Sequence, residues 1–534
     1  MMQSFESSRV ESWLAWFFKG LLICVCLFIL ARLFELQVIK GAYYRDLSES
    51  NRIRRVPITA PRGIIFARGG EVLVGNKEVT MTVKFDPEEG FDKLPVYNET
   101  PDGEKFQEWN RTYLLGQDFA HVSGYLGEVN EDEVGKVDPE CLHKGPRTIG
   151  SFIGRGGLEQ YYDCLLRGTD GEEIVEVNTF GIKERQIGRK PPEAGQDIHT
   201  TIDYKLQKKL AELMKDKKGA ALVTDTKGEV LALVSSPSFD PNKSISEYLT
   251  DDSLPLFDRA IGGTYQPGSI FKIVTSAAAL ENQIIDRDYR YIDTGFISAD
   301  NGNFLYRNWY YTQYGGTEGS IDLAKAIARS TDTFFYEVGA KTGVDELEEW
   351  SKNFGLGGLT NIDLPNEKAG LVPSPAWKKA VIGERWFLGN TYHYAIGQGD
   401  LALTPAEVHR IAMAIASNGK LCDLHINSDK DGNCKNIGIT QAHLDYIREG
   451  MVAVCADGGT AFTFFDFQPQ AACKTGTAQT GGEDETHAWF TVFTPAEKPE
   501  LVITVLIEKG GEGSKDASPI ARELLDFWNR ERNP

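Results

Sequence analysis

Positive charge is in short supply in this chain of 534 residues. Lys and Arg number 57 against 77 Asp and Glu, which gives a formal net charge of -20 at pH 7. Because so acidic a surface repels phosphate backbones, we expect no nucleic-acid partner. The 8 cysteines are too dilute for a small disulfide-stapled domain, although an oxidising compartment would permit a few bridges. The composition, 41% apolar and 25% charged, excludes wholesale disorder, collagen and coiled coil, and the length suits two or three domains.

One segment lacks charge almost entirely. Between Trp13 and Phe34 the only charged residues are Lys19 and Arg32, and the stretch 21–31 is purely apolar. A helix of about 20 residues spans a hydrocarbon core of ~30 Å. No small-residue cleavage site follows, so we predict an uncleaved transmembrane anchor rather than a removed signal peptide or a buried soluble helix. Basic residues flank both ends, so their distribution leaves the orientation open.

The stretch from residue 35 to residue 215 lacks a recognisable catalytic group. It holds short alternating runs such as Val79–Val83, a turn cluster at 67–70 and a Gly-rich segment at 154–157. Alternation with a period of two indicates half-buried strands. We therefore predict a mixed, β-rich pedestal over 35–215.

A different pattern begins at Gly219. Two apolar runs, 220–225 and 230–235, flank a turn sequence and predict a β-hairpin. A helix-rich middle follows, and then come three strand candidates and an amphipathic helix, at 471–479, 487–493, 501–508 and 519–530. Strands at both ends with helices between them predict one α+β domain over 216–534, whose sheet joins the two ends.

The first chemical motif is the segment 267–272, Pro-Gly-Ser-Ile-Phe-Lys, which leads into an apolar run ending at Leu280. A Pro-Gly turn before such a run predicts the start of a buried helix. Ser269 and Lys272 then lie on one helical face, with side chains close enough to hydrogen bond. A Ser beside a desolvated Lys is a nucleophile beside its base, and a helix N-terminus offers free N–H groups to an oxyanion.

Two motifs occur twice, and one copy of each is set aside. Ser417 and Lys420 repeat the Ser-x-x-Lys spacing, but on an Asn-Gly turn that does not hold the two side chains on a common face. Lys-Thr-Gly at 341–343 ends a helical run, where the Gly is explained as a helix C-cap. The copy that begins the segment 474–479 lies in a strand pattern instead. Such a strand, with Lys, hydroxyls and a bare Gly, would run alongside an extended peptide and grip its carboxylate.

The third motif, Ser-Thr-Asp at 330–332, falls between two helical runs and by itself is typical of a helix N-cap. In this order and spacing, the three motifs resemble the active-site set of the penicillin-binding proteins and serine β-lactamases. Further segments and the single anchor resemble the class B penicillin-binding proteins, which are monofunctional transpeptidases; these segments are 51–63, 156–159, 195–207 and 397–399 with 404–405. Asp332, followed by Thr-Phe-Phe-Tyr, is similar to the elongation-type penicillin-binding protein 2 group, whereas division-type members usually carry Asn there.

The resemblance implies a fold and a reaction. The fold is a cytoplasmic tail (1–12), a transmembrane helix (13–34), the pedestal and a transpeptidase domain with a central antiparallel sheet and helices. The reaction is a two-step acyl transfer on peptidoglycan stem peptides ending in D-Ala-D-Ala, without a cofactor, during wall elongation. It implies that the catalytic domain lies outside the cytoplasmic membrane and that β-lactams inhibit it. The expected partner is a SEDS-family glycan polymerase such as RodA.

The resemblance also assigns roles at the site. Ser269 attacks the penultimate D-Ala carbonyl, Lys272 is its base, and Ser330 relays the proton to the departing amine. Asp332 and Lys474 complete the catalytic set. Burial and the Lys474 cation favour a neutral Lys272, whereas Asp332 opposes it, and the sequence leaves that balance open.

The resemblance assigns substrate binding to the strand motif at 474–479. Lys474, Thr475 and Thr477 would bind the terminal carboxylate, with Gly476 between the two threonines. The backbone N–H groups of Ser269 and Thr477 would form the oxyanion hole, in which one donor contributes about 3 to 4 kcal/mol.

Two departures from the family matter. Elongation-type members carry a substantial head region, for which only Gly75–Ala120 is available here. Some relatives hold zinc with Cys and His between the first two motifs, but the segment 272–330 contains neither, so we predict no metal. The alternatives are a division-type transpeptidase, a β-lactamase or an inactive scaffold. A β-lactamase would need a water-activating Glu, and none can be identified from the sequence.

The cysteines outside the anchor suggest bridges. Cys422 and Cys434 bracket a polar segment that reads as an exposed loop, which a disulfide would close. Cys455 ends a helical run and Cys473 directly precedes Lys474, so a bridge there would hold the entry to the substrate strand, although two buried free thiols remain an equal alternative. The remaining pair, at 141 and 164, is left unassigned.

Overall fold

The computed structural model describes residues 9–86, 90–95, 104–178, 183–299, 302–480 and 485–532. It divides into two compact units. The first consists of residues 1–61, 78–109 and 168–194, and the second of residues 62–77, 110–167 and 195–534.

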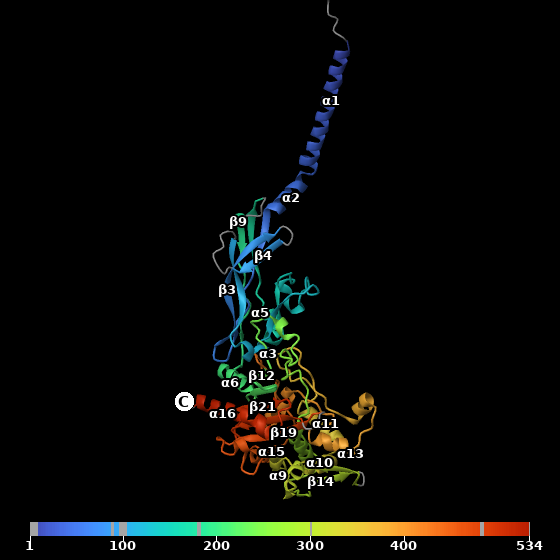
Figure 1. Ribbon diagram of the computed structural model, residues 1–534, viewed down its shortest axis with the longest axis vertical. Coiled ribbons are helices and arrows are strands. Elements are labelled where there is room, and N and C mark those ends of the chain that lie inside the picture. Colours follow the sequence, from blue (N-terminus) through green and yellow to red (C-terminus); the bar gives the residue numbers. More distant parts are fainter. Residues whose placement is uncertain are drawn as a thin grey trace, which may run out of the picture. The chain divides into compact units, whose positions relative to one another are not determined.

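The first unit begins with the long helix α1 (Arg9–Phe34), followed by a π-helical turn (Glu35–Ile39) and α2 (Gly41–Arg52) (Figure 1). The stretch Trp13–Ile39 is long and apolar enough to cross a membrane. Its large apolar side chains are exposed, unlike those of a core helix. The helix therefore covers the predicted anchor.

The rest of the first unit is built from antiparallel strands. The strand β8 (Gly171–Val177) lies between β1 (Ile53–Ile58) and β9 (Lys183–Lys190). The long strand β3 (Val72–Asp86) belongs to this unit from residue 78 onward, and this part contains the predicted alternating run and pairs with β4 (Gly90–Pro95). The strand β5 (Glu104–Tyr113) also pairs with β3.

The second unit is organised around a five-stranded antiparallel sheet in the order β12-β11-β21-β20-β19. The strands are β11 (Gly219–Thr224), β12 (Val230–Ser236), β19 (Ala472–Gln479), β20 (Thr486–Thr494) and β21 (Leu501–Ile507). The predicted hairpin and the three C-terminal strands are confirmed, and the early strand β11 pairs with the late strand β21, while β12 and β19 form the two edges of the sheet. The predicted α+β class is confirmed, because β11 pairs with β21 and closes the sheet across the whole domain.

Helices cover this sheet and bury apolar side chains against it. The helix α14 (Pro405–Ala416) is buried throughout, and its His409 bonds Thr224 on β11 and Thr504 on β21. The helices α6 (Tyr204–Met214) and α16 (Ser518–Arg532) pack against each other and against the sheet. The helix α16 covers the predicted amphipathic segment.

The helices between the early and the late strands of the sheet make up most of the rest of this unit. Its main members are α7 (Lys272–Glu281), α9 (Leu323–Arg329), α10 (Asp332–Thr342), α11 (Val344–Asn353), α13 (Leu388–Ala395) and α15 (Gln441–Cys455). The shorter helices are α3 (Ala120–Ser123), α4 (Gly157–Tyr161), α5 (Asp163–Leu166), α8 (Trp309–Tyr314) and α12 (Pro375–Trp377). Short strand pairs complete the unit, namely β2 (Ile65–Phe66) with β10 (Ile198–His199), β6 (Tyr125–Glu128) with β7 (Phe152–Arg155), β13 (Tyr291–Asp293) with β16 (Gly319–Ile321), β14 (Phe296–Ala299) with β15 (Phe304–Arg307), and β17 (Lys420–Leu421) with β18 (Lys435–Asn436).

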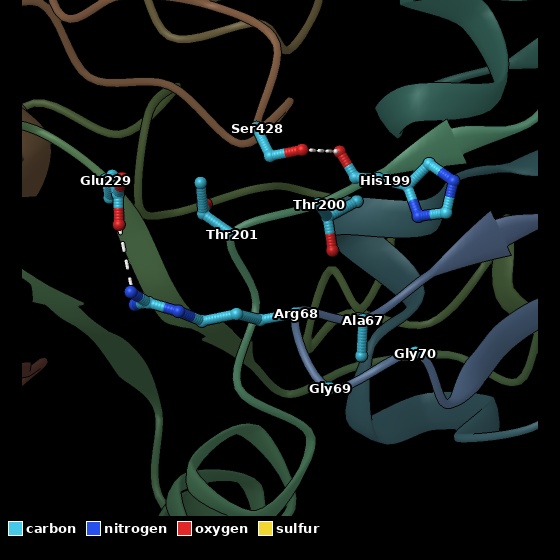
Figure 2. A pocket seen from close by; sticks show the side chains of 9 residues that line it. All are labelled: Ala67, Arg68, Gly69, Gly70, His199, Thr200, Thr201, Glu229 and Ser428. Carbon is cyan, nitrogen blue, oxygen red and sulfur yellow. Dashed lines mark hydrogen bonds and ion pairs between the residues drawn. The ribbon is translucent and has the colours of Figure 1, made fainter.

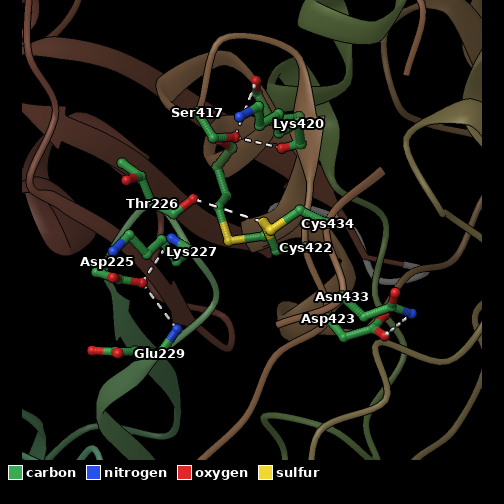
Figure 3. The surroundings of a disulfide bond; sticks show 12 residues. Asp225, Thr226, Lys227, Glu229, Ser417, Lys420, Cys422, Asp423, Asn433 and Cys434 are labelled. Atoms are coloured by element: carbon green, nitrogen blue, oxygen red, sulfur yellow. Dashed lines mark hydrogen bonds between the residues drawn. A yellow bond between two sulfur atoms is a disulfide. The ribbon is translucent and has the colours of Figure 1, made fainter. Parts of the chain in front are cut away.

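Three disulfides cross-link the second unit. The structure pairs Cys422 with Cys434 and Cys455 with Cys473. The first of these lies beside the turn of the β11–β12 hairpin (Figure 3). The third disulfide joins Cys141 to Cys164, a pair that the sequence left unassigned. Spacing alone did not reveal it, because the two residues meet only after the chain between them has folded back.

Candidate active site

Ser269 lies in a short 3₁₀ turn, Gly268–Phe271, directly before α7. The predicted buried helix is present, but Ser269 precedes its α-helical part. Gly268 has a φ of 55°, and a Cβ there would lie 2.8 Å from the carbonyl oxygen of Thr477 on β19. Only Gly allows so close an approach with this backbone. The turn therefore brings Ser269 against the strand that carries the third motif.

Lys272 is fully buried and directs its ammonium at the second motif. Its Nζ donates to Asp332 Oδ1 at 2.6 Å, to the Ser330 carbonyl at 2.8 Å and to Ser330 Oγ at 3.2 Å. These bonds use all three protons of the ammonium. The Ser269 hydroxyl is half-buried and has no hydrogen-bond partner among the described residues. The bond expected between Ser269 and Lys272 is therefore not made in this state.

Ser330 occupies a strained position between two helices. It ends α9 as the C-cap with a φ of 54°, and α10 begins at Asp332. A non-glycine residue in this left-handed region costs about 1–3 kcal/mol and is concentrated at functional sites. The N-cap alternative is wrong, because Thr331 holds that position and makes no side-chain cap bond. The backbone instead aims the Ser330 hydroxyl at the two lysines.

Lys474 lies on β19, the edge strand of the sheet, as the strand pattern predicted. Its buried Nζ donates to Ser330 Oγ at 3.0 Å and to the Thr475 carbonyl at 2.8 Å. A Cβ at Gly476 would lie 2.8 Å from the side chain of Trp489, so the bare residue lets β19 pack tightly on β20. The Thr477 carbonyl accepts a bond from Gln398 Nε2 at 3.3 Å. The three motifs thus meet at Ser330 Oγ, which both buried lysines contact.

The electrostatics of the site follow from its burial. Burial lowers the pKa of Lys272 even though the Asp332 carboxylate opposes the shift. Burial and the neighbouring Lys272 charge hold the pKa of Lys474 well below its usual range, again against Asp332. Burial therefore outweighs Asp332 at both lysines, and the pKa of each lies below its usual value.

Sequence reasoning missed the residues that hold Asp332. Its Oδ2 accepts from the backbone N–H of Trp309 at 3.1 Å, and its own N–H donates to Asn308 Oδ1 at 3.1 Å. Asn308 is buried and also donates to Asp293 Oδ2 at 3.3 Å. Asn308 precedes α8 and would be taken for an ordinary N-cap, so no local signal marks this contact.

The two discarded motif copies have structural roles. Ser417 Oγ donates to the Met413 carbonyl at 2.6 Å and also bonds the Lys420 carbonyl, while Lys420 itself is exposed (Figure 3). Asn418 and the following Gly have φ values of 54° and 76°, as a tight turn requires. Gly343 is the C-cap of α10, as expected.

A polar cavity of about 490 Å³ lies elsewhere in the second unit (Figure 2). Arg68 reaches Glu229 across it at 3.4 Å, and Ser428 Oγ donates to the His199 carbonyl at 3.0 Å. No motif residue lines this cavity. Among the described residues, no group of three or more His, Cys, Asp and Glu is placed to hold a metal ion.

Comparison with known proteins agrees with this geometry. Residues 219–526 match the family "Penicillin binding protein transpeptidase domain", and residues 96–200 match "Penicillin-binding Protein dimerisation domain". The peptidoglycan D,D-transpeptidase MrdA of Haemophilus influenzae is 31% identical, over 97% of this chain and 91% of its own length.

Two solved structures resemble most of this chain. A chain from the complex of penicillin-binding protein 2 with MreC from Helicobacter pylori is 26% identical to this chain and matches it with a TM-score of 0.77. The match covers 89% of this chain and 99% of that one. A structure described as "Structural coordination of polymerization and crosslinking by a peptidoglycan synthase complex" is 28% identical with a TM-score of 0.76, over 97% of this chain and 98% of that one. The chain therefore belongs to the penicillin-binding proteins, within their penicillin-binding protein 2 group of peptidoglycan D,D-transpeptidases.

Proposed function

We propose that Ser269 is the nucleophile of this peptidoglycan D,D-transpeptidase, which cross-links stem peptides through a serine acyl-enzyme during wall elongation and is a target of penicillin. The observation that carries the assignment is the Ser330 hydroxyl, which Lys272 contacts at 3.2 Å and Lys474 at 3.0 Å. Two buried lysine Nζ atoms on one hydroxyl supply a proton path, and Ser269, three residues before Lys272, is the nucleophile that this path would serve.

The first step transfers the acyl group to the enzyme. Once Lys272 has lost a proton, its lone pair is free to take the Ser269 hydroxyl proton as Oγ attacks the penultimate D-Ala carbonyl. The lowered pKa of Lys272 makes that neutral state accessible. Ser330 then passes a proton to the nitrogen of the departing D-Ala, and the scissile bond breaks.

The second step resolves the acyl-enzyme. An amine from a second stem peptide attacks the ester carbonyl, its proton returns along the same path, and Ser269 is released. In both steps the backbone N–H groups of Ser269 and Thr477 stabilise the oxyanion. Thr475, Thr477 and the Lys474 cation bind the donor carboxylate along β19, with Gly476 leaving room for the peptide.

We also propose the setting of the reaction. The helix α1 anchors the chain in the cytoplasmic membrane, with residues after 34 on the outer side, where peptidoglycan is cross-linked. The domain limits proposed from the sequence are 35–215 for the pedestal and 216–534 for the transpeptidase domain. A RodA-like SEDS polymerase is the proposed partner. The solved synthase complex of a relative and the MreC complex of another support working in such assemblies.

Labelling with a fluorescent penicillin tests the nucleophile. Ser269→Ala should abolish covalent labelling in the membrane fraction, while the matched control Ser417→Ala should keep it, because Ser417 only bonds backbone carbonyls. Labelling that survives Ser269→Ala would refute the assignment. The same assay separates the alternatives, since transient labelling of the wild type indicates a β-lactamase and no labelling indicates a scaffold.

A further inference from the structure

One short segment, Cys455–Thr460, touches the immediate neighbours of two catalytic motifs. It leaves the end of α15 and turns back sharply, with a Gly459 at which a Cβ would lie 2.3 Å from two carbonyl oxygens of α15. The helix α15 itself packs closely on α9, where a Cβ at Gly450 would lie 2.9 Å from Ile327. The helix that leads into the segment therefore packs on α9, the helix whose C-cap is Ser330.

The first contact of the segment is with the strand β19. Cys455 is disulfide-bonded to Cys473, the residue before Lys474, and both are buried. Thr460 Oγ1 lies 2.8 Å from Thr475 Oγ1, the residue after Lys474. Covalent and hydrogen bonds thus fix the chain on both sides of Lys474.

The second contact is with the end of α9. Arg329 Nη1 donates to the Gly458 carbonyl at 3.0 Å, and Arg329 directly precedes Ser330. Its Nε also donates to Glu318 Oε1 at 2.8 Å, which fixes the guanidinium in place. The segment therefore ties the neighbours of Ser330 to the neighbours of Lys474, and those two side chains meet at 3.0 Å.

We propose that the segment 455–460 is a positioning clamp, which sets the distance between Ser330 and Lys474, and that Thr460 orients the Thr475 hydroxyl toward the substrate carboxylate. The inference rests on the proposed role of Thr475. A hydroxyl that accepts a bond from Thr460 keeps its own proton free to donate to the carboxylate. None of these clamp residues touches the reacting atoms, so they act through Ser330, Lys474 and Thr475.

The disulfide is tested with a matched control in the same chain. Cys455→Ala with Cys473→Ala should slow acylation by benzylpenicillin about tenfold, because small displacements of catalytic groups are costly. Cys422→Ala with Cys434→Ala removes a bridge of similar sequence separation, 12 against 18 residues, so its effect on the unfolded chain is similar. That control should acylate at the wild-type rate. Equal rates for the two double variants would overturn the clamp.

Thr460 is tested by a measurement that would stay unchanged if the role of Thr460 were purely structural. The ratio of acylation rates for benzylpenicillin and its methyl ester reports recognition of the carboxylate. Thr460→Val should lower that ratio about fivefold, the value of one hydrogen bond, and Thr460→Ser should restore it. An unchanged ratio would overturn the role of Thr460, whether or not both rates fall.

These results are distinguishable from failure of the proposed function. If Ser269→Ala still labels, the nucleophile is wrong, whatever Thr460 does. If the wild type labels at Ser269 and the ratio does not respond to Thr460→Val, only the clamp fails. The Thr460 variants also decide the matter if the Cys455/Cys473 double variant does not fold.

Discussion

Two clusters of buried charge in the second unit differ in how they are balanced. The first contains three arginines and two carboxylates. Glu159 accepts from Arg62 at 2.7 Å and from Arg111 at 2.6 Å, and Asp163 accepts from Arg62 at 3.0 Å and from Arg147. Burial opposes the charge of Arg62, but the two carboxylates outweigh it and raise its pKa. Burial likewise opposes the charge of Asp163, but Arg62 and Arg147 outweigh it and lower its pKa, so both Arg62 and Asp163 are stabilised as ions.

The proposed catalytic cluster has fewer counter-charges by comparison. Lys272 and Lys474 share one nearby carboxylate, that of Asp332, and both have lowered pKa values. Desolvation costs several kcal/mol per ion unless partners offset it. A lysine can meet that cost by releasing a proton, whereas arginine remains charged. Burial in the arginine–carboxylate cluster thus accompanies fixed ion pairs, whereas burial in the proposed catalytic cluster lowers the pKa values of two lysines toward those of a base.

The largest expected effect comes from replacing a lysine of the proposed catalytic cluster with arginine, the cation of the arginine–carboxylate cluster. Lys272→Arg keeps the cation but removes the neutral state, so acylation by fluorescent penicillin should fall at least about a thousandfold. The control is Lys420→Arg, on the exposed turn copy of the motif, which should label normally. Retained labelling by Lys272→Arg would show that no neutral lysine is needed.

The next largest effect concerns the arginine–carboxylate cluster around Glu159. Glu159→Gln leaves Arg62 and Arg111 without their shared carboxylate, which should lower the free energy of unfolding by about 3–5 kcal/mol. Glu133→Gln breaks the half-exposed pair with Arg155 at 2.7 Å and should cost no more than about 1 kcal/mol. Thermal unfolding of the two variants gives the comparison. Equal losses would mean that burial does not distinguish these ion pairs.

The smallest effect is a shift in pH dependence. Asp332 raises the pKa of Lys272 against the lowering by burial, so Asp332→Asn should lower that pKa further. Acylation needs the neutral lysine, and its rate rises with pH through this pKa; the rising limb should therefore move to lower pH while most activity remains.

Stopped-flow acylation across pH measures this shift, with the exposed Asp252→Asn as control. An unchanged profile would show that Asp332 bonds the Trp309 N–H and the Asn308 side chain without coupling to Lys272.

Much of this protein was predictable from local pattern. The apolar run of the anchor, the hairpin at 220–235 and the three C-terminal strands follow from side-chain periodicity, which depends on neighbouring residues only. The turn chemistry at Asn418 and Gly343 also separated the two chance motif copies from those proposed to be catalytic. The sequence by itself determined the class of fold, the family and the residues to be brought together.

The tertiary structure decided how those residues meet. Ser330, whose backbone is left-handed, places its hydroxyl between two lysines that are 58 and 144 residues away in sequence. The position of this hydroxyl could not be inferred from the N-cap pattern around Ser330. The pairing of Cys141 with Cys164, the partners of Asp332 and the sign of the Lys272 pKa shift belong to the same class. Each depends on distance and desolvation between segments remote in sequence, and these quantities exist only once the chain has packed.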